Sequence, residues 1–440
     1  MKVLKFGGTS LASAEKIRSV VELISDDEPK IVVLSAMAGT TDTLVEITNY
    51  LLKNNKDTAS ELTSSLEKEY KKTVEKLYKT EEYKSKAMGM VLSHFNHIRS
   101  FFYKYYSQHQ MKSVLAQGEL LSSSLLHLVL EEEGKNSALL PALNFMRMDR
   151  TEEPDEFYIK ENLERELQPY PNTRLFITQG YICRNAFGEI DNLKRGGSDF
   201  TASLIAAAVN AEELQIWTDI TGFHNNDPRY VKNTHTIREL SFDEAAELAY
   251  FGAKILHPSS VLPCKLKDIP VRLKNTMKPE DEGTLISNNT SEGDIRAVAA
   301  KDGIIAIKIQ SHRMLLAYGF IRKVFEVFEM YKTPVDVITT SEVAVSVTID
   351  SPENLESILN DLKKLGTVEL EQEQSIVCVV GNLQADKKGL VAKIFNALSE
   401  IPIRMISYGG SPYNVTFLVN TENKTKTLSA LNKNLFGHEE

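Results

Sequence analysis

The chain has 440 residues, which at about 150 residues per domain predicts two or three domains with sizeable cores. Charged residues make up 25% and hydrophobic residues 42%, and 22 Gly and 14 Pro are too few for a low-complexity or collagen-like chain. The 51 Lys and Arg against 60 Asp and Glu give a net charge of −9, which argues against a general nucleic-acid-binding surface.

The three cysteines, Cys183, Cys264 and Cys378, lie far apart and form no CxxC or Cys/His pattern. Neither a disulfide framework nor a zinc site is predicted, and a reducing compartment fits best. No apolar run approaches the roughly 18 residues of a membrane helix, and the start MKVLKFGGTS reaches glycine too early for a signal peptide. We therefore expect a cytoplasmic protein with no membrane partner.

Strands and helices alternate along the first part of the chain. An apolar strand at 3–6 is followed by a glycine turn and by helical spacing of apolar residues over 14–24. A second strand at 31–34 leads through small residues into a helix at 44–52. This alternation predicts a parallel α/β sheet.

A charged stretch at 57–111 keeps helical spacing and is almost free of Gly and Pro, so it predicts a helical insertion with solvated faces. The α/β pattern then resumes, with strands at 175–178 and 214–218 and helices at 200–211 and 242–251. A polar passage after Asn275 marks a domain boundary, and we place the first domain at 1–285.

The remainder contains a weak internal repeat, in which Gly319–Phe325 resembles Gly389–Phe395. Each copy is preceded by a strand, at 304–309 and 376–380, and is followed by two more. This order predicts two small α+β domains in tandem, at 286–370 and 371–440.

Two glycine-rich turns carry the first chemical signal. Lys5 ends a strand and is followed by Gly7 and Gly8, whose backbone N–H groups could approach a phosphate before a helix. The structural alternative is a tight turn with a solvent-facing lysine. Neither the GxxxxGK[ST] nor the GxGxxG fingerprint occurs, so a phosphate site here belongs to another fold.

The turn at 195–199 repeats this logic with a guanidinium, two glycines, a hydroxyl and a carboxylate before a helix. Asp199 could orient Lys5, hold Mg²⁺ between phosphates, or only cap the helix. Glu119, the one carboxylate opening an apolar helix, could complement the helix dipole or bind a substrate amine.

In combination these segments resemble the aspartate kinases (aspartokinases) of the amino acid kinase family. The motifs occur in the family's order: KFGGTS at Lys5, VVLSAMAGTTDTL at Val32, GE at Gly118, TQGYI at Thr178, RGGSDFTA at Arg195, WTDITG at Trp217, DPR at Asp227, FGAKILHP at Phe251 and KNT at Lys274. The resemblance implies a three-layer α/β/α kinase domain with a mainly parallel sheet. It also implies two ferredoxin-like ACT domains. The first strand of the first ACT domain, at about 296–300, would be shared with the second ACT domain.

The family's reaction converts ATP and L-aspartate to ADP and 4-phospho-L-aspartate, the first step of lysine, threonine and methionine biosynthesis. The attacking β-carboxylate is already ionised near pH 7, so the site needs no general base. It needs positioning and charge neutralisation. The resemblance implies that Lys5 stabilises the transferred phosphoryl group and that Asp199 orients Lys5. Mg²⁺ is implied, bound mainly through the ATP phosphates without a dedicated protein cage.

The resemblance also implies two groups of substrate contacts. Aspartate would be held through its α-carboxylate by Arg195, through its ammonium by Glu119, and by the nearby residues Ser35, Thr41, Tyr181 and Ser198. ATP would contact Lys5, Gly7, Gly8, Ser198, Thr218, Asp219, His224, Asp227, Arg229 and Lys254. Two positions depart from the family, because His224 stands where many members have Tyr and Lys194 replaces a frequent glycine.

The ACT region implies an amino-acid effector, with lysine or threonine as candidates, and a homodimer or higher even oligomer. The implied effector residues are Met314, Leu315, Gly319, Phe320, Ile321, Val335, Asp336, Ser341 and Glu342. Phe320 and Met314 could instead belong to the core, and the identity of the effector stays open.

Two rival functions are a kinase of the same fold for another acid, carbamate or a nucleotide, and a non-catalytic amino-acid sensor. The ACT pair and the combination of Glu119, Arg195 and KFGGTS favour aspartate over the first rival. The second rival predicts the loss of Lys5 or Asp199, and both are present.

Overall fold

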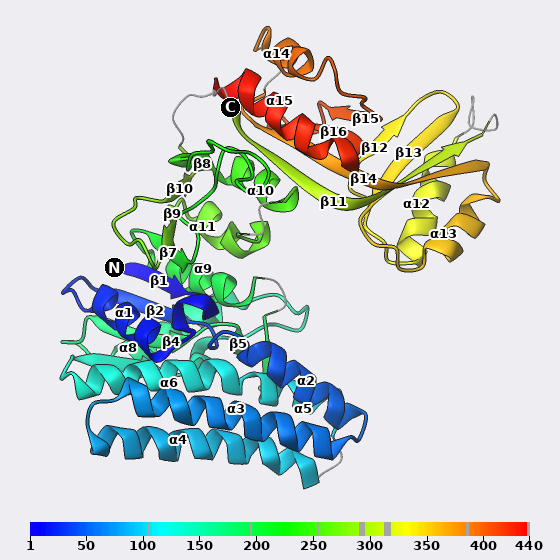
Figure 1. Cartoon of the computed structure of the whole chain (residues 1–440). Coiled ribbons are helices and arrows are strands. Elements are labelled where there is room, and N and C mark those ends of the chain that lie inside the picture. The colour runs from blue at the N-terminus through cyan, green and yellow to red at the C-terminus, as the bar shows by residue number, and fades with distance from the viewer. Residues whose placement is uncertain are drawn as a thin grey trace. The chain divides into compact units, whose positions relative to one another are not determined.

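The computed structural model describes residues 1–103, 106–193, 196–252, 255–289, 295–311, 318–383 and 387–437. The chain forms two compact units (Figure 1). Unit 1 comprises Met1–Phe223 and Leu256–Thr290, and unit 2 comprises His224–Ile255 and Ser291–Glu440. The segment 224–255, which the sequence analysis placed in the kinase domain, therefore belongs to unit 2, and the domain boundaries at 285 and 370 stay predictions.

Unit 1 is built around a sheet flanked by helices. Its strands are β1 (Lys2–Phe6), β2 (Lys30–Leu34), β3 (Ser137–Leu140), β4 (Leu175–Gln179), β5 (Ile182–Arg184), β6 (Ile190–Asn192), β7 (Leu214–Thr218), β9 (Val271–Asn275) and β10 (Thr284–Ser287). Its helices are α1 (Ala14–Ile24), α2 (Thr40–Leu52), α3 (Lys56–Leu77), α4 (Glu81–Ser100), α5 (Gln108–Leu115), α6 (Gln117–Glu132), α7 (Ala142–Phe145), α8 (Glu156–Leu167), α9 (Gly197–Val209) and α11 (Leu262–Leu266).

The main sheet of unit 1 runs in the order β3-β4-β2-β1-β7-β9-β10. Every neighbouring pair from β3 to β9 is parallel, and only β10 is antiparallel to β9. Strands such as β2 and β4 are buried along their whole length, as expected for a sheet covered on both faces. The mainly parallel α/β fold is confirmed. The chain order reverses between β1 and β7, and the carboxyl ends of strands at such a point are where ligands bind.

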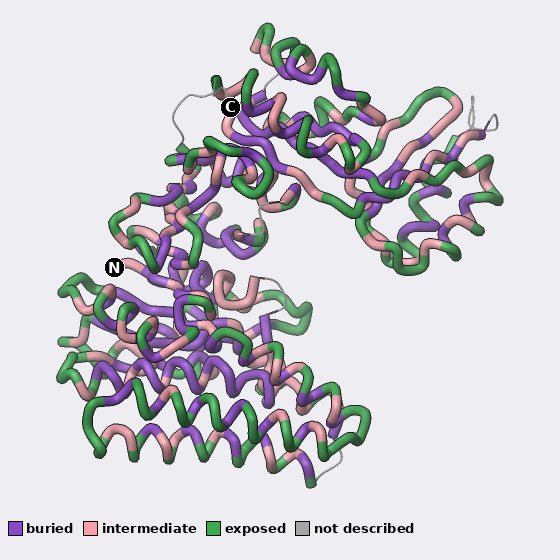
Figure 2. Tube along the Cα trace, in the orientation of Figure 1, coloured by how far each residue is buried: buried purple, intermediate pink, exposed green. Residues whose placement is uncertain are grey.

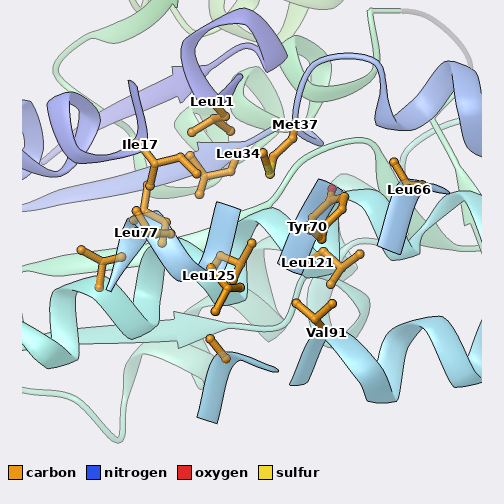
Figure 3. Packing of buried hydrophobic residues seen from close by; sticks show 14 of the residues in the cluster. Leu11, Ile17, Leu34, Met37, Leu66, Tyr70, Leu77, Val91, Leu121 and Leu125 are labelled. Atoms are coloured by element: carbon orange, nitrogen blue, oxygen red, sulfur yellow. The ribbon is translucent and has the colours of Figure 1, made fainter. Parts of the chain in front are cut away.

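The range 57–111, predicted as a helical insertion, contains α3, α4 and α5, with α3 and α4 side by side and α4 against α6 (Figure 1). Leu66, Tyr70 and Leu77 of α3 lie in one buried apolar cluster with Val91 of α4 and Leu125 of α6 (Figure 3). Burying an apolar side chain of this size stabilises a fold by about 1.5–3 kcal/mol. Along α3 and α4, buried residues recur at helical spacing and are separated by exposed residues (Figure 2).

The stretch Gln108–Glu132, which spans α5 and α6, has the length and apolar composition of a membrane-crossing helix, and 72% of its apolar 18-residue window is buried. The sequence analysis had found no such apolar run. A core helix of a globular unit has the same composition, because both faces of the helix are covered by apolar neighbours.

Unit 2 contains one extended sheet in the order β12-β13-β11-β14-β16-β15. The six strands of this sheet are β11 (Ile295–Gln310), β12 (Ile338–Thr340), β13 (Ala344–Ile349), β14 (Thr367–Gly381), β15 (Met405–Tyr408) and β16 (Asn414–Asn420), and unit 2 also contains β8 (Glu239–Ser241), which is not part of it. Its helices are α10 (Phe242–Tyr250), α12 (Phe320–Met330), α13 (Leu355–Leu362), α14 (Leu390–Ala397) and α15 (Lys424–Phe436).

Two long antiparallel strands, β11 and β14, join the halves of this sheet. The first part of β11 pairs with β14 near Val380, and its last part pairs with both β13 and the start of β14. A register shift between Lys301 and Ile304 separates the two parts. The strands expected at 296–300 and 304–309 are thus one strand, because the sequence around Gly303 bulges without ending the ladder.

Candidate active site

The end of β1 and its glycine turn form one wall of the candidate active site. The amide of Gly7 donates to the carbonyl of Trp217 on β7 at 3.2 Å, so this N–H is engaged within the protein. The carbonyl of Gly8 accepts from the amide of Ala38 at 3.2 Å. A Cβ atom on Gly8 would lie 2.9 Å from the carbonyl oxygen of Ala36, so only glycine lets the two loops approach this closely.

Lys5 and Asp199 meet across this site. The Nζ atom of Lys5 lies 2.7 Å from Oδ1 of Asp199, and the two side chains are only 12% and 16% exposed. Helix α9 begins at Gly197, three residues earlier than predicted, because Gly196 adopts a left-handed conformation with φ of 64° and caps the helix. Asp199 therefore lies in the first turn and is not the N-cap residue, so the capping alternative is wrong.

The N-terminus of α9 is packed tightly against the loop that follows β4. A Cβ atom on Gly180 would lie 2.5 Å from the side chain of Ser198. Tyr181 has a φ of +66°, its amide donates to Oγ1 of Thr201 at 2.9 Å, and its hydroxyl accepts from Asn192 at 3.0 Å. The loop of Gly180 and Tyr181 thus packs against Gly197 and Ser198 at the start of α9, and the contact of Ser198 and Tyr181 with a substrate stays a prediction.

Glu119 is a buried carboxyl group at the start of α6, only 3% exposed. Its Oε1 atom accepts from the amide of Ala36 at 3.3 Å, whereas Oε2 has no hydrogen-bond partner. Desolvation raises the pKa of Glu119 to about 8, although hydrogen bonds from the amides of Ala36 and of Glu119 itself lower it. A buried carboxyl group with one open oxygen is suited to receive a cationic group.

Ser35 and Thr41 flank the same loop after β2. The amide of Ser35 donates to the carbonyl of Phe6 at 3.1 Å, and its own carbonyl accepts from Ser122 of α6 at 2.7 Å. Thr41 lies in the first turn of α2, next to Thr40, which exchanges a hydrogen bond with Tyr70 of α3 at 2.9 Å. Ser35 is thereby held between the end of β1 and the helix that carries Glu119.

Thr218 and Asp219 follow β7. The hydroxyl of Thr218 donates to Oδ1 of Asp219 at 3.0 Å, and its carbonyl accepts from the amide of Thr276 at 2.8 Å. Ser10 of the KFGGTS motif exchanges a buried hydrogen bond with Thr276 at 2.7 Å. The sequence analysis assigned no role to Ser10 or Thr276, although both lie in motifs that it quoted.

A second partly buried cation, Lys274, lies next to these residues and was also given no role. Its Nζ atom is 5.1 Å from the ring centre of Trp217 and donates to the carbonyl of Pro279 at 2.8 Å. Desolvation lowers the pKa of Lys274, as does the nearby charge of Arg272. The KNT motif was the only sequence signal for this lysine.

Several predicted site residues lie outside the described part of the chain: Lys194, Arg195, Lys254, Met314 and Leu315. Three further nucleotide candidates belong to unit 2. Asp227 pairs with Arg229 at 2.7 Å, and His224 exchanges a hydrogen bond with Thr234 at 3.2 Å. Their contact with a nucleotide stays a prediction.

The predicted effector residues gather around the start of α12 and the strands β12 and β13 in unit 2. Gly319 caps α12 with a φ of 80°, and Phe320 is buried in an apolar cluster that Val335 also contacts. Ile321 is 42% exposed, and the amide of Ser341 donates to the carbonyl of Ala344. Glu342 is exposed. Asp336 has a buried side chain that pairs with Lys301 at 3.1 Å.

No group of three or more His, Cys, Asp or Glu side chains in the described ranges is arranged to hold a metal ion. Asp199, the carboxylate nearest to the glycine turn among the residues discussed above, is engaged with Lys5.

Comparison with known proteins agrees with this geometry. The profile of the amino acid kinase family matches residues 1–275, and a profile of the ACT domain matches residues 377–435. The chain is 34% identical to the lysine-sensitive aspartokinase 3 of Escherichia coli, over 99% of both chains.

Two solved structures of the E. coli aspartokinase III are also similar to this chain. One, in complex with lysine and aspartate in the T-state, has a TM-score of 0.85 at 33% identity and covers 99% of both chains. The other, in complex with aspartate and ADP in the R-state, has a TM-score of 0.79 at 32% identity and covers 99% of this chain and all of that one, at 100%. The chain therefore belongs to the amino acid kinase family and, within it, to the aspartokinases.

Proposed function

We propose that this chain transfers the γ-phosphoryl group of ATP to the β-carboxylate of L-aspartate, giving ADP and 4-phospho-L-aspartate. The observation that carries the proposal is the contact of 2.7 Å between Lys5 and Asp199 beside the glycine turn after β1. This contact supports the proposal, because a fixed, half-enclosed cation beside the glycine turn would stabilise the negative charge of a transferred phosphoryl group. The E. coli relative solved with aspartate and ADP supports the substrates.

In this proposal Lys5 stabilises the transferred phosphoryl group, and Asp199 holds the lysine amino group in position. The carboxylate of aspartate attacks the γ-phosphorus directly, and the bond to the leaving ADP oxygen breaks. Because the attacking carboxylate is ionised at neutral pH, no side chain has to remove a proton. The amides at the first turn of α9 and at Gly8 complete the positive surroundings.

Glu119 would bind the α-ammonium of aspartate. Its Oε2 atom lies buried without a partner, and an ammonium group would supply the missing donor while favouring the ionised carboxylate. Arg195 would hold the α-carboxylate as a two-pronged donor. Ser35, Thr41, Tyr181 and Ser198 complete the proposed aspartate site.

The adenine and ribose would contact Thr218, Asp219 and the loop that follows, with His224, Asp227, Arg229 and Lys254 reaching toward ribose or phosphates. Mg²⁺ would be bound mainly by the ATP phosphates. When bound there, it neutralises phosphate charge that Lys5 alone cannot balance.

We also propose feedback control by an amino acid through the ACT region, with lysine or threonine as effector. A lysine-sensitive E. coli relative, solved with lysine, favours lysine. A homodimer or larger even assembly through the ACT domains, and a cytoplasmic location, complete the proposal.

The test is ADP release from Mg-ATP with L-aspartate and, separately, with L-glutamate. Hydroxylamine trapping of the acyl phosphate identifies the product as a phosphorylated carboxylate. We expect turnover with aspartate only, and inhibition when lysine or threonine is added. Turnover with glutamate but not aspartate would favour a kinase for another acid. No turnover with either acid, from protein that still binds ATP, would favour an amino-acid sensor.

A further inference from the structure

Helix α10 presents three polar side chains along one face to the sheet of unit 2. Glu244, Glu247 and Tyr250 are spaced by three residues, which aligns them on that face. The carboxylate of Glu244 lies 3.5 Å from Nε of Arg296 at the start of β11. Glu244 also forms a capping box with Ser241 at the N-terminus of α10. The whole face is thus directed at regulatory strands.

The two halves of the sheet each hold α10 at a different point. In the second half, the carboxylate of Glu247 accepts from the hydroxyl of Ser411 at 2.7 Å and from the side-chain amide of Asn414 at 2.6 Å. In the first half, the hydroxyl of Tyr250 donates to Oδ1 of Asp336 at 2.7 Å. A shift of either half relative to the other would therefore pull on this helix.

Asp336 is the centre of the second attachment. Its side chain is 2% exposed. Oδ1 accepts a hydrogen bond from the hydroxyl of Tyr250 and lies 3.1 Å from the amino group of Lys301. Lys301 is itself shared with Asp350 at 2.8 Å. The other oxygen of Asp336, Oδ2, is buried without a hydrogen-bond partner.

A buried carboxylate oxygen without a partner destabilises the fold, and a new donor would remove that penalty. An ammonium group carries three N–H donors. A ligand ammonium at Oδ2 of Asp336 would share the carboxylate with Lys301 and Tyr250, which already donate to Oδ1, so its affinity would depend on whether the Tyr250 hydrogen bond is intact.

The chain after α10 leads directly into the motif FGAKILHP at Phe251. Gly252 has a φ of +148° and lies so close to β11 that a Cβ atom would be 2.3 Å from the carbonyl oxygen of Ala300, the neighbour of Lys301. The segment that contains the proposed phosphate contact Lys254 is therefore packed at its start against β11, the strand that carries Lys301, the partner of Asp336.

We propose that Tyr250 is a positioning residue that couples an amino-acid ammonium at Asp336 to nucleotide affinity, through α10 and the segment that follows it. This inference rests on the proposed function for the nucleotide role of that segment and for the presence of an effector. A ligand ammonium at Asp336 would weaken the hydrogen bond from Tyr250 to Asp336. The resulting shift of α10 would move the segment that follows the helix.

The test measures the Kd of ATP by isothermal titration calorimetry on the full chain, with and without saturating L-lysine, and in a separate series with L-threonine. The variant Tyr250→Phe removes only the hydroxyl. The matched control is Tyr331→Phe, whose hydroxyl donates to Asp361 at 2.8 Å within the same unit. The ratio of the two ATP Kd values measures the coupling between the sites.

We expect at least one of the two amino acids to change the ATP Kd of the wild type by about 5-fold or more. This ratio should fall to within about twofold of one in Tyr250→Phe and stay unchanged in Tyr331→Phe. Ser411→Ala removes the hydrogen bond from Ser411 to Glu247 without changing a residue of α10, and it should give an intermediate ratio. This variant keeps the proposal testable if Tyr250→Phe fails to fold.

A wild-type ratio in Tyr250→Phe would overturn the coupling role, and so would a wild type whose ATP Kd neither amino acid changes. The reaction itself is decided separately by aspartate-dependent ADP release in the wild type. An enzyme that turns over aspartate with no change in coupling on loss of the Tyr250 hydroxyl would refute this inference and leave the proposed function intact.

Discussion

The amino group of Lys5 and the carboxylate of Asp199 lie 2.7 Å apart, although Lys5 lies near the end of β1 and Asp199 lies in the first turn of α9. Lys5→Ala removes the cation from the proposed phosphoryl site. We expect kcat to fall about 10²–10³-fold, because a fixed charge aimed at the transition state is lost. Steady-state ADP release measures the effect.

Lys2→Ala is the matched control, since Lys2 lies on the same strand but pairs with Glu28 at 2.6 Å. It should keep kcat within about twofold of wild type, as surface ion pairs contribute about 0–1 kcal/mol. Equal activity of the two variants would contradict the assignment of Lys5.

Asp199→Asn keeps the shape of the side chain but removes the charge that holds Lys5. We expect kcat to fall about 10²-fold from misplacement of the lysine. The double variant with Lys5→Ala should be little slower than Lys5→Ala alone, because the two residues act as one unit. Losses in kcat that simply multiply in the double variant would argue against a positioning role.

The buried carboxyl group of Glu119 makes the free energy of unfolding decrease as the pH rises, which is the opposite of the usual effect of a carboxyl group. Its pKa in the folded state is raised from 4.5 to about 8 by burial, so the folded chain binds more protons than the unfolded chain between these values. Stability from this group therefore falls as the pH rises through that window. Urea unfolding of Glu119→Gln should show a gain over wild type at pH 8 that disappears near pH 5.

Glu67 provides the opposite sign as a control. Burial raises its pKa, but hydrogen bonds and charges from Lys71 and Arg99 outweigh this and hold the pKa below its usual value. Its contribution is present above the unfolded pKa and is lost in acid. Glu67→Gln should therefore destabilise the protein at neutral pH, and a parallel pH response of the two variants would refute the sign given for Glu119.

Aspartate binding should respond to the same ionisation. If Glu119 receives the ammonium, the KM for aspartate should fall as the pH is raised through about 8, because more of the carboxyl group is already ionised. In Glu119→Gln the KM should rise about tenfold or more and lose this dependence, since a charge-assisted bond is replaced by a weaker one. The KM for ATP serves as the internal control.

Gly180→Ala tests the close packing of the two loops around α9. The new Cβ atom would lie 2.5 Å from the Ser198 side chain and 2.8 Å from its Cα atom, so the start of α9 must shift. We expect a loss of stability of about 1–3 kcal/mol and a larger loss of kcat. Thermal unfolding and ADP release measure the two effects.

Gly89→Ala is the contrasting substitution, because Gly89 lies within α4 with open space around its Cα atom. Alanine should stabilise the helix by about 0.5–1 kcal/mol without affecting kcat. A stable and fully active Gly180→Ala variant would show that the start of α9 need not hold its position.

The local pattern of the sequence determined the strands and helices around the site. Lys5 at the end of an apolar strand, the two glycines after it and the Ala-rich helix after Asp199 could be recognised because these features depend on neighbours within a few residues. The family followed from the joint order of short motifs, since each motif alone is ambiguous.

Only the tertiary structure decided which distant residues meet. The 2.7 Å contact of Lys5 with Asp199 depends on α9 packing against β1, an arrangement that the periodicity of either segment does not contain. The raised pKa of Glu119 likewise comes from burial by other elements.

The attachment of α10 to the regulatory strands has the same origin. Glu247 and Tyr250 look like ordinary surface residues of an amphipathic helix, and their partners Ser411 and Asp336 lie far along the chain. Side-chain pairs of this kind are selected by packing between elements and leave no local periodic signal, so they could be found only once the chain was folded.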